Sequence, residues 1–130
     1  MYLVYIPCPN MRVAQRLAKL LLAQKQIACA NIIPSTSLYV WQGNLTQSRE
    51  WILLGKTMFT KTCTKKSIEQ LVLSSHPYKL PAILFFSCSA HEPFVSWVKK
   101  SLVQDLTQEH PSSKHIQQKT KGKNKGKTSE

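Results

Sequence analysis

Apolar residues recur along this chain at two spacings, and these predict its strands and helices. Short runs rich in aliphatic and aromatic residues are typical of strands, whereas apolar residues three or four positions apart indicate helices. The predicted strands are 2–6, 27–33 continuing extended through 38–41, 45–58 and 82–87. The predicted helices run from behind Asn10 to about 26, over 61–75, and over 93–107. Three helices and four strands therefore account for most of the chain.

The second and third strands are expected to form one long hairpin. Gln42-Gly43-Asn44 supplies the turn, because Gly or Asn accepts a positive φ. Pro34 has no backbone donor, so it must sit at a bulge or on a sheet edge. Apolar side chains occupy both faces of the return strand near 51–54. The hairpin is too long and too apolar for a small monomer to cover, so we expect other copies of the chain to cover it.

The order of elements predicts the fold class. Strand, helix, strand, strand, helix, strand, helix is the α+β ferredoxin-like plan, a split βαβ unit with an extra C-terminal helix. Its four-stranded antiparallel sheet carries helices on one face and leaves the other face bare. Because the hairpin carries Tyr39, Trp41 and Trp51, we expect another subunit to cover it.

Composition divides the 130 residues into a globular part, 1–108, and a tail, 109–130. Residues 1–110 hold 12 basic and 5 acidic side chains, a net charge of +7. Residues 111–130 hold six Lys, one Glu and a single aliphatic residue, Ile116. Such a segment buries too little apolar surface to fold, so we expect a disordered Lys-rich tail. It is expected to aid solubility or to bind polyanions weakly.

The spacing of the cysteines, the first residues and the length of the longest apolar run favour a cytoplasmic location. Cys8, Cys29, Cys63 and Cys88 stand far apart without the close pairs of a structural zinc site. The chain opens on MYLVYI without a basic region before it, so no secretory signal is apparent. The longest apolar run, 82–86, is far shorter than a membrane span, and we expect no membrane partner.

Several segments carry a family resemblance. They are CPN at 8–10, ACANIIP at 28–34, SLYVWQGNL at 37–45, Glu50 with LLGKT at 53–57, HPYKLP at 76–81, and Phe94 with Trp97-Val98. On these segments, in order across about residues 1–105, the chain resembles the CutA (divalent-cation tolerance) family. The resemblance implies a ferredoxin-like fold and a tight homotrimer whose hairpins pair between subunits. It also implies a role in the response to divalent metal ions, no enzymatic reaction, and possible weak binding of Cu(II) or another divalent cation.

The family also provides an alternative and a set of departures. The trimer is similar to that of the PII signalling proteins, so a small-ligand signalling role is the alternative. Family copper sites combine a Cys of the first strand with two His before the Pro-Tyr pair. Here Ile6 and Ser75 occupy two of those places and only His76 remains. Lys79 stands where many members have Glu.

Cys29, Cys8 and His76 are the candidate metal ligands, because copper favours thiolate and imidazole. Cys8 and Cys29 flank one helix, so two antiparallel passes of the chain are expected to bring them near each other. The competing interpretation is that the thiols pack as small hydrophobes and that His76 caps the second helix.

An intersubunit cleft is the second candidate site. Its expected walls are Tyr39, Trp41, Glu50, Trp51, Lys56 and Tyr78. Glu50 and Lys56 share a strand face by parity and are expected to pair across the sheet with a neighbour. The competing interpretation is that these aromatics form interface core, where aromatics are enriched.

No catalytic residues are predicted. The chain lacks a nucleophile elbow, a phosphate-binding GxxxxGK[ST] motif and an HExxH motif. A basic nucleic-acid-binding module is the remaining alternative. An RNA-recognition domain would carry stacking aromatics on its third strand, but that strand reads EWILLGKT.

Overall fold

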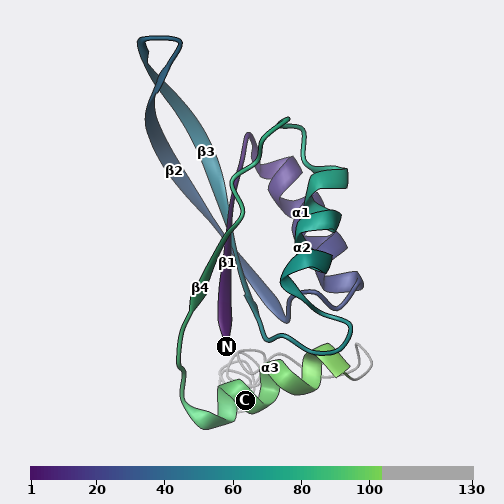
Figure 1. The fold of residues 1–130 in the computed structure, drawn as a ribbon. Helices are drawn as coiled ribbons and strands as arrows, with labels where there is room; N and C mark the ends of the chain where they lie inside the picture. Colours follow the sequence, from purple (N-terminus) through teal and green to yellow (C-terminus); the bar gives the residue numbers. More distant parts are fainter. Residues whose placement is uncertain (104–130) are drawn as a thin grey trace, which may run out of the picture.

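The computed structural model describes residues 1–103, which form one four-stranded antiparallel sheet with two helices against one face and a third helix across the end of the sheet near the N-terminus (Figure 1). The elements are β1 (Tyr2–Cys8), α1 (Met11–Ala23), β2 (Cys29–Trp41), β3 (Asn44–Thr57), α2 (Lys65–Ser75), β4 (Leu84–Ser87) and α3 (Glu92–Val103). The strand order is β2-β3-β1-β4, which confirms the predicted α+β split βαβ plan. The predicted end of the last helix near 107, the boundary at 108 and the Lys-rich tail lie outside the described residues.

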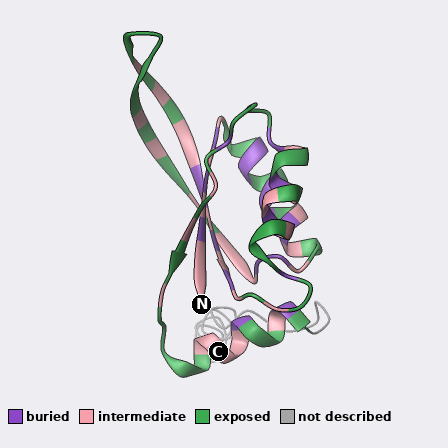
Figure 2. Cartoon of the chain, viewed as in Figure 1, coloured by how far each residue is buried: buried purple, intermediate pink, exposed green. Residues whose placement is uncertain are grey.

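The core lies between the sheet and the two helices α1 and α2. Alternate residues of β1 (Val4, Ile6 and Cys8) are fully buried and belong to one cluster with apolar residues of both helices. The helical members of that cluster are Val13, Ala14, Leu17, Ala18, Leu21, Ile68 and Val72. Figure 2 shows this buried band between the layers. Val98 and Leu102 of α3 are buried outside the cluster, and α3 contacts β3.

The end of α1 differs from the sequence prediction. The first helix ends at Ala23 rather than near Gln26, because Lys25 takes a left-handed φ of 53°. The amides of Lys25 and Gln26 then donate to the carbonyls of Leu22 and Leu21, which closes a Schellman motif. Glycine usually occupies this position, so the sequence carried no stop signal here.

The second helix begins at Lys65 rather than at 61. Thr64 is its N-cap, and the side chains of Thr64 and Ser67 each accept a hydrogen bond from the other residue's backbone amide. This reciprocal capping box satisfies two amides that the first turn would leave unpaired. Residues 61–63 instead belong to the preceding loop, where Cys63 is buried.

The β2–β3 hairpin runs in one register from Cys29 opposite Lys56 to Trp41 opposite Asn44. Pro34 lies on the edge strand β2, as expected, and no extra residue interrupts the pairing beside it. Gln42 and Gly43 take positive φ values of 49° and 77°, so the turn has two residues. The expected three-residue turn was too long, since Asn44 is already paired in the strand.

The outer half of this hairpin projects beyond the rest of the sheet (Figure 1). Because β1 pairs only with residues 51–57 of β3, residues 35–50 form a two-stranded ribbon, here named the hairpin arm. Most of the arm is exposed (Figure 2), and its large exposed apolar residues are Leu38, Tyr39, Val40, Trp41 and Leu45. An isolated two-stranded ribbon is at best marginally stable in water. Within residues 1–103, no helix is long and apolar enough to cross a bilayer.

Candidate functional site

A chain of hydrogen bonds joins β1 to the connection between α2 and β4. Strand β4 pairs with residues 2–5 of β1 only, so it does not reach Pro7. The His76 ring fills this place, with Nε2 lying 2.8 Å from the Pro7 oxygen. The Tyr78 amide donates to His76 Nδ1 over 3.1 Å. Since Nδ1 accepts, the proton must be on Nε2, and both ring nitrogens of this buried histidine are used.

Tyr78 carries the network on to the hairpin arm. Its hydroxyl donates to Glu50 Oε2 over 3.1 Å. Burial, the hydrogen bond to Glu50 and the charge of that carboxylate raise the pKa of Tyr78 to about 12. Burial and the same carboxylate raise the pKa of the Cys8 thiol to about 11. At neutral pH Cys8 is therefore a protonated thiol, which is a poor metal ligand and a poor nucleophile.

Cys29 lies at the opposite end of the sheet from Cys8. The register places Cys8 opposite Trp51 and Cys29 opposite Lys56, five residues or about 17 Å further along β3. The expectation that the two thiols come close was wrong. Helix α1 carries the chain back to the end of the sheet where β1 starts, and β2 begins there, whereas Cys8 is at the other end. Burial raises the pKa of Cys29, and the neighbouring Lys56 ammonium opposes that rise. Lys56 itself donates to the Asn31 side chain.

The described residues contain no group of three or more His, Cys, Asp or Glu side chains able to hold a metal ion. Of the three candidate ligands, His76 has both ring nitrogens engaged, Cys8 is buried and protonated, and Cys29 is distant from both. Residues 1–103 of a single chain thus do not bring the predicted copper ligands together.

The predicted cleft residues lie in different places. Glu50 and Tyr78 meet at the base of the arm, and Tyr39 is close enough to raise the pKa of Tyr78 further. Trp51 follows Glu50 on β3, so its side chain leaves the opposite face, where it packs against the core with the Arg49 guanidinium 5.3 Å from its ring centroid. Trp41 is at the tip of the arm, and Lys56 lies at the far end of the sheet. One chain alone therefore supplies only part of the expected cleft.

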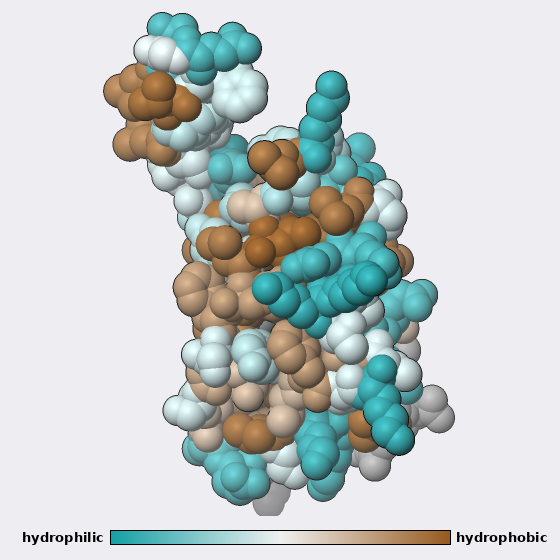
Figure 3. Space-filling model, viewed as in Figure 1, coloured by the Kyte–Doolittle hydropathy of each residue, from teal (hydrophilic) through white to brown (hydrophobic). Residues whose placement is uncertain are grey.

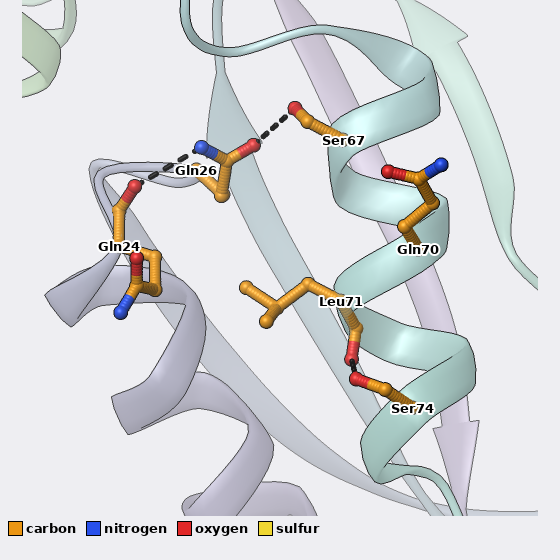
Figure 4. A pocket seen from close by; sticks show the side chains of 6 residues that line it. All are labelled: Gln24, Gln26, Ser67, Gln70, Leu71 and Ser74. Carbon is orange, nitrogen blue, oxygen red and sulfur yellow. Dashed lines mark hydrogen bonds between the residues drawn. The ribbon is translucent and has the colours of Figure 1, made fainter.

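Sequence reasoning missed a polar depression between the end of α1 and α2 (Figure 4). It encloses about 320 Å³ and is lined by Gln24, Gln26, Ser67, Gln70, Leu71 and Ser74. The Gln26 amide is almost fully buried, donates to the carbonyls of Gln24 and Thr62, and accepts from the Ser67 hydroxyl. With no ionisable lining residue, the depression offers no acid–base chemistry, and Gln26 joins the two helices. No sequence pattern distinguishes this glutamine from an exposed one.

The match to a family model decides the relationship. Residues 2–101 match the family described as CutA1 divalent ion tolerance protein. The chain belongs to this family. It is a family of non-enzymatic tolerance proteins, in agreement with the expectation from the sequence.

Individual relatives agree with this assignment. The chain is 34% identical over 96 residues to the CutA homolog of Xenopus laevis, a match that covers 72% of this chain and 62% of that protein. It therefore spans less than two thirds of this relative. The CutA1 crystal structure from Ehrlichia chaffeensis is 31% identical, with a TM-score of 0.69 over 78% of this chain and 94% of the other. A CutA from Archaeoglobus fulgidus, described as periplasmic, is 28% identical, with a TM-score of 0.70 over 78% of this chain and 99% of the other.

Proposed function

We propose that this protein acts in the tolerance of divalent metal ions as a homotrimer whose subunits join through their hairpin arms. The observation that carries the proposal is the arm itself. It exposes 63% of Leu38, 63% of Trp41 and 77% of Leu45 on a ribbon that has no third strand. Fully burying one large apolar side chain stabilises an assembly by about 1.5–3 kcal/mol, so several per arm would sustain a tight contact.

Assembly also gives the divided cleft residues a way to meet. Glu50 and Lys56 are six residues apart on β3, or about 20 Å, so an ion pair between them requires a neighbouring chain. We propose that Tyr39, Glu50, Trp51 and Tyr78 of one subunit face Trp41 and Lys56 of another. This cleft is where a small ligand would bind, and in that case the alternative of a ligand-controlled signalling trimer would apply.

We also propose that the assembled protein binds Cu(II) weakly. Cys29 is the candidate with the best claim, because it is only half-buried and the Lys56 ammonium offsets part of the rise that burial causes in its pKa. Its partners would have to come from another subunit. We therefore expect weak Cu(II) binding that depends on assembly, with Cys8 and His76 contributing little.

A reducing compartment, the cytoplasm, is proposed as the location. All four cysteines lie in the described residues, and all four are free thiols. Cys8 and Cys63 are buried among apolar groups and act as core residues. Reduced thiols are typical of proteins held in a reducing environment.

The trimer is tested by light scattering or sedimentation at micromolar concentration. One chain has a mass of 14.8 kDa, so a trimer has a mass of about 44 kDa. A stable particle of single-chain mass would refute the assembly. For the metal, Cu(II) is titrated into the wild type, Cys29→Ser and His76→Ala. We expect Cys29→Ser to weaken binding and His76→Ala to leave it unchanged, and equal binding by all three would remove Cys29 from the proposal.

A further inference from the structure

The outer face of the helix layer is strongly basic. Its exposed cations are Arg12, Arg16 and Lys19 on α1 and Lys66 on α2, with Lys61 in the loop before α2. The Lys65 ammonium turns towards the sheet instead and lies 5.5 Å from the centroid of the Phe85 ring. Glu69 is the one carboxylate on these two helices. Arg16 donates to the Ser75 carbonyl, which joins α2 to this face. Within residues 1–103, Arg12, Lys19 and Lys66 make no ion pair with a carboxylate.

Helix stability does not account for these positions. The N-terminal turn of a helix favours acidic side chains, because the helix dipole places positive charge there. The first turns of α1 and α2 contain no acidic residue and carry Arg12, Lys65 and Lys66 instead. In the same protein α3 follows the stabilising rule, with Glu92 in its first turn and Lys100 in its last. The basic side chains on α1 and α2 are thus placed against the local electrostatic preference.

We propose that this basic helix face binds duplex nucleic acid through its phosphate backbone, without sequence preference. Arg12, Arg16 and Lys19 fall on one side of α1 at spacings of four and three residues and span about 10 Å. A duplex presents one negative charge per roughly 1.7 Å of its axis, so a row of this length meets several phosphates. Guanidinium groups also match the geometry of phosphate oxygens.

Other polyanionic partners fit this face less well. A helix that binds a membrane surface needs a free apolar side, but the apolar sides of α1 and α2 are buried in the core. Single-stranded nucleic acid is held largely by stacking on aromatic rings. No aromatic residue occurs in α1 or α2. On the side of the molecule where these helices lie, Figure 3 shows hydrophilic side chains interspersed with hydrophobic ones.

This inference goes beyond metal tolerance and does not depend on it. The proposed trimer would use the hairpin arms, which leaves the helix layer facing outward. Three copies would then present three basic faces, and linked faces strengthen binding to a long duplex without new contacts. A single chain would still bind, but more weakly.

The test uses the full chain and a labelled DNA duplex of about 24 base pairs of arbitrary sequence, with a matched RNA duplex, at about 50–200 mM salt. Arg12→Gln/Lys19→Gln removes two charges from the basic helix face. Lys99→Gln/Lys100→Gln removes two exposed charges from α3 and is the matched control. Anisotropy measures affinity, and circular dichroism confirms that each variant is folded.

We expect the wild type to bind both duplexes with a linear dependence of log affinity on log salt. Arg12→Gln/Lys19→Gln should lower the steepness of that dependence by about 2 and the affinity by about tenfold or more, whereas the control should change affinity less than about threefold. If the double variant does not fold, Arg12→Gln and Lys19→Gln alone should each lower the steepness by about 1.

Four results would overturn the inference. They are no binding at the lowest salt, equal weakening by the test and control variants, loss of binding when the six lysines of residues 111–130 are changed to Gln, and tighter binding to phosphatidylserine vesicles than to the duplex. The third result would assign binding to the Lys-rich segment, and the fourth would assign the face to a membrane surface. None of them bears on the trimer, whose mass is measured separately.

Discussion

The Tyr78 hydroxyl donates a 3.1 Å hydrogen bond to Glu50 Oε2 and so ties the connection between α2 and β4 to the base of the hairpin arm. The two residues are 28 positions apart in the sequence. His76 anchors the same connection to β1 through the Pro7 carbonyl. The arm therefore meets the body of the protein at a point held by two tertiary hydrogen bonds, one of them to a carboxylate.

Tyr78→Phe should lower the free energy of unfolding by about 1 kcal/mol, because a hydrogen bond to a partly exposed carboxylate contributes modestly. Glu50→Gln is the control, since the amide oxygen can still accept from the Tyr78 hydroxyl. Urea unfolding at one fixed protein concentration measures both variants. If Tyr78→Phe is as stable as the wild type, the contact does not hold the arm.

Stability should fall at alkaline pH. The pKa of Cys8 is raised to about 11 and that of Tyr78 to about 12, above their ordinary values of 9.0 and 10.0. From about pH 9 upward, the unfolded chain loses these protons before the folded chain does. The folded state then binds more protons, so the free energy of unfolding decreases as pH rises toward 12.

A variant with Cys8→Ala and Tyr78→Phe should show a flatter decrease, whatever its stability at neutral pH. Urea unfolding from pH 8 to pH 11 measures the slope. All other residues are the same in both proteins, so the difference between the two slopes isolates Cys8 and Tyr78. Parallel slopes would contradict the assignment.

Alternation along the chain was enough to predict the strands, and the turn at Gly43 was enough to predict the hairpin. The same pattern did not reveal contacts between distant elements. His76 reaches Pro7 only because β4 pairs with β1 as far as Tyr5 and then stops. The expected proximity of Cys8 and Cys29 failed because β1 and β2 are parallel, so the end of β1 and the start of β2 lie at opposite ends of the sheet. The end of α1 was also missed, because Lys25 takes the left-handed conformation that glycine usually provides after a helix.

Lys25→Gly should raise the free energy of unfolding by up to about 1 kcal/mol. Lys25 holds a φ of 53° at the end of α1, and glycine adopts that region without steric cost. Lys25→Ala keeps a side chain at the same φ and is the control that should bring no gain. Thermal or urea unfolding distinguishes the two variants. Equal stability of Gly and Ala at this position would show that the left-handed residue carries no strain.

Gly55→Ala should destabilise the protein by about 1–3 kcal/mol through overpacking. A Cβ atom added at Gly55 would lie 2.9 Å from Cγ2 of Ile27, which is only 2% exposed and cannot move aside. Ile27→Ala removes the clash but leaves a cavity. In a double-mutant cycle, the two changes together should cost less than the sum of the single costs. Simple additivity would mean that the strand shifts to accept the new methyl group.

Trp41→Ala tests whether the hairpin arm is covered by another subunit. The Trp41 side chain is 63% exposed in one chain, so its truncation in a monomer should change stability by no more than about 0.5 kcal/mol. In a trimer joined through the arms it should cost several kcal/mol, as expected for a large aromatic removed from a packed interface. Leu73→Ala is the matched control, because Leu73 is 55% exposed but lies on α2, away from the arm. Melting temperature and particle mass are measured across a range of protein concentrations. If the Trp41→Ala variant has the melting temperature and the particle mass of the wild type, then no other subunit covers the arm, and the main support for the trimer is removed.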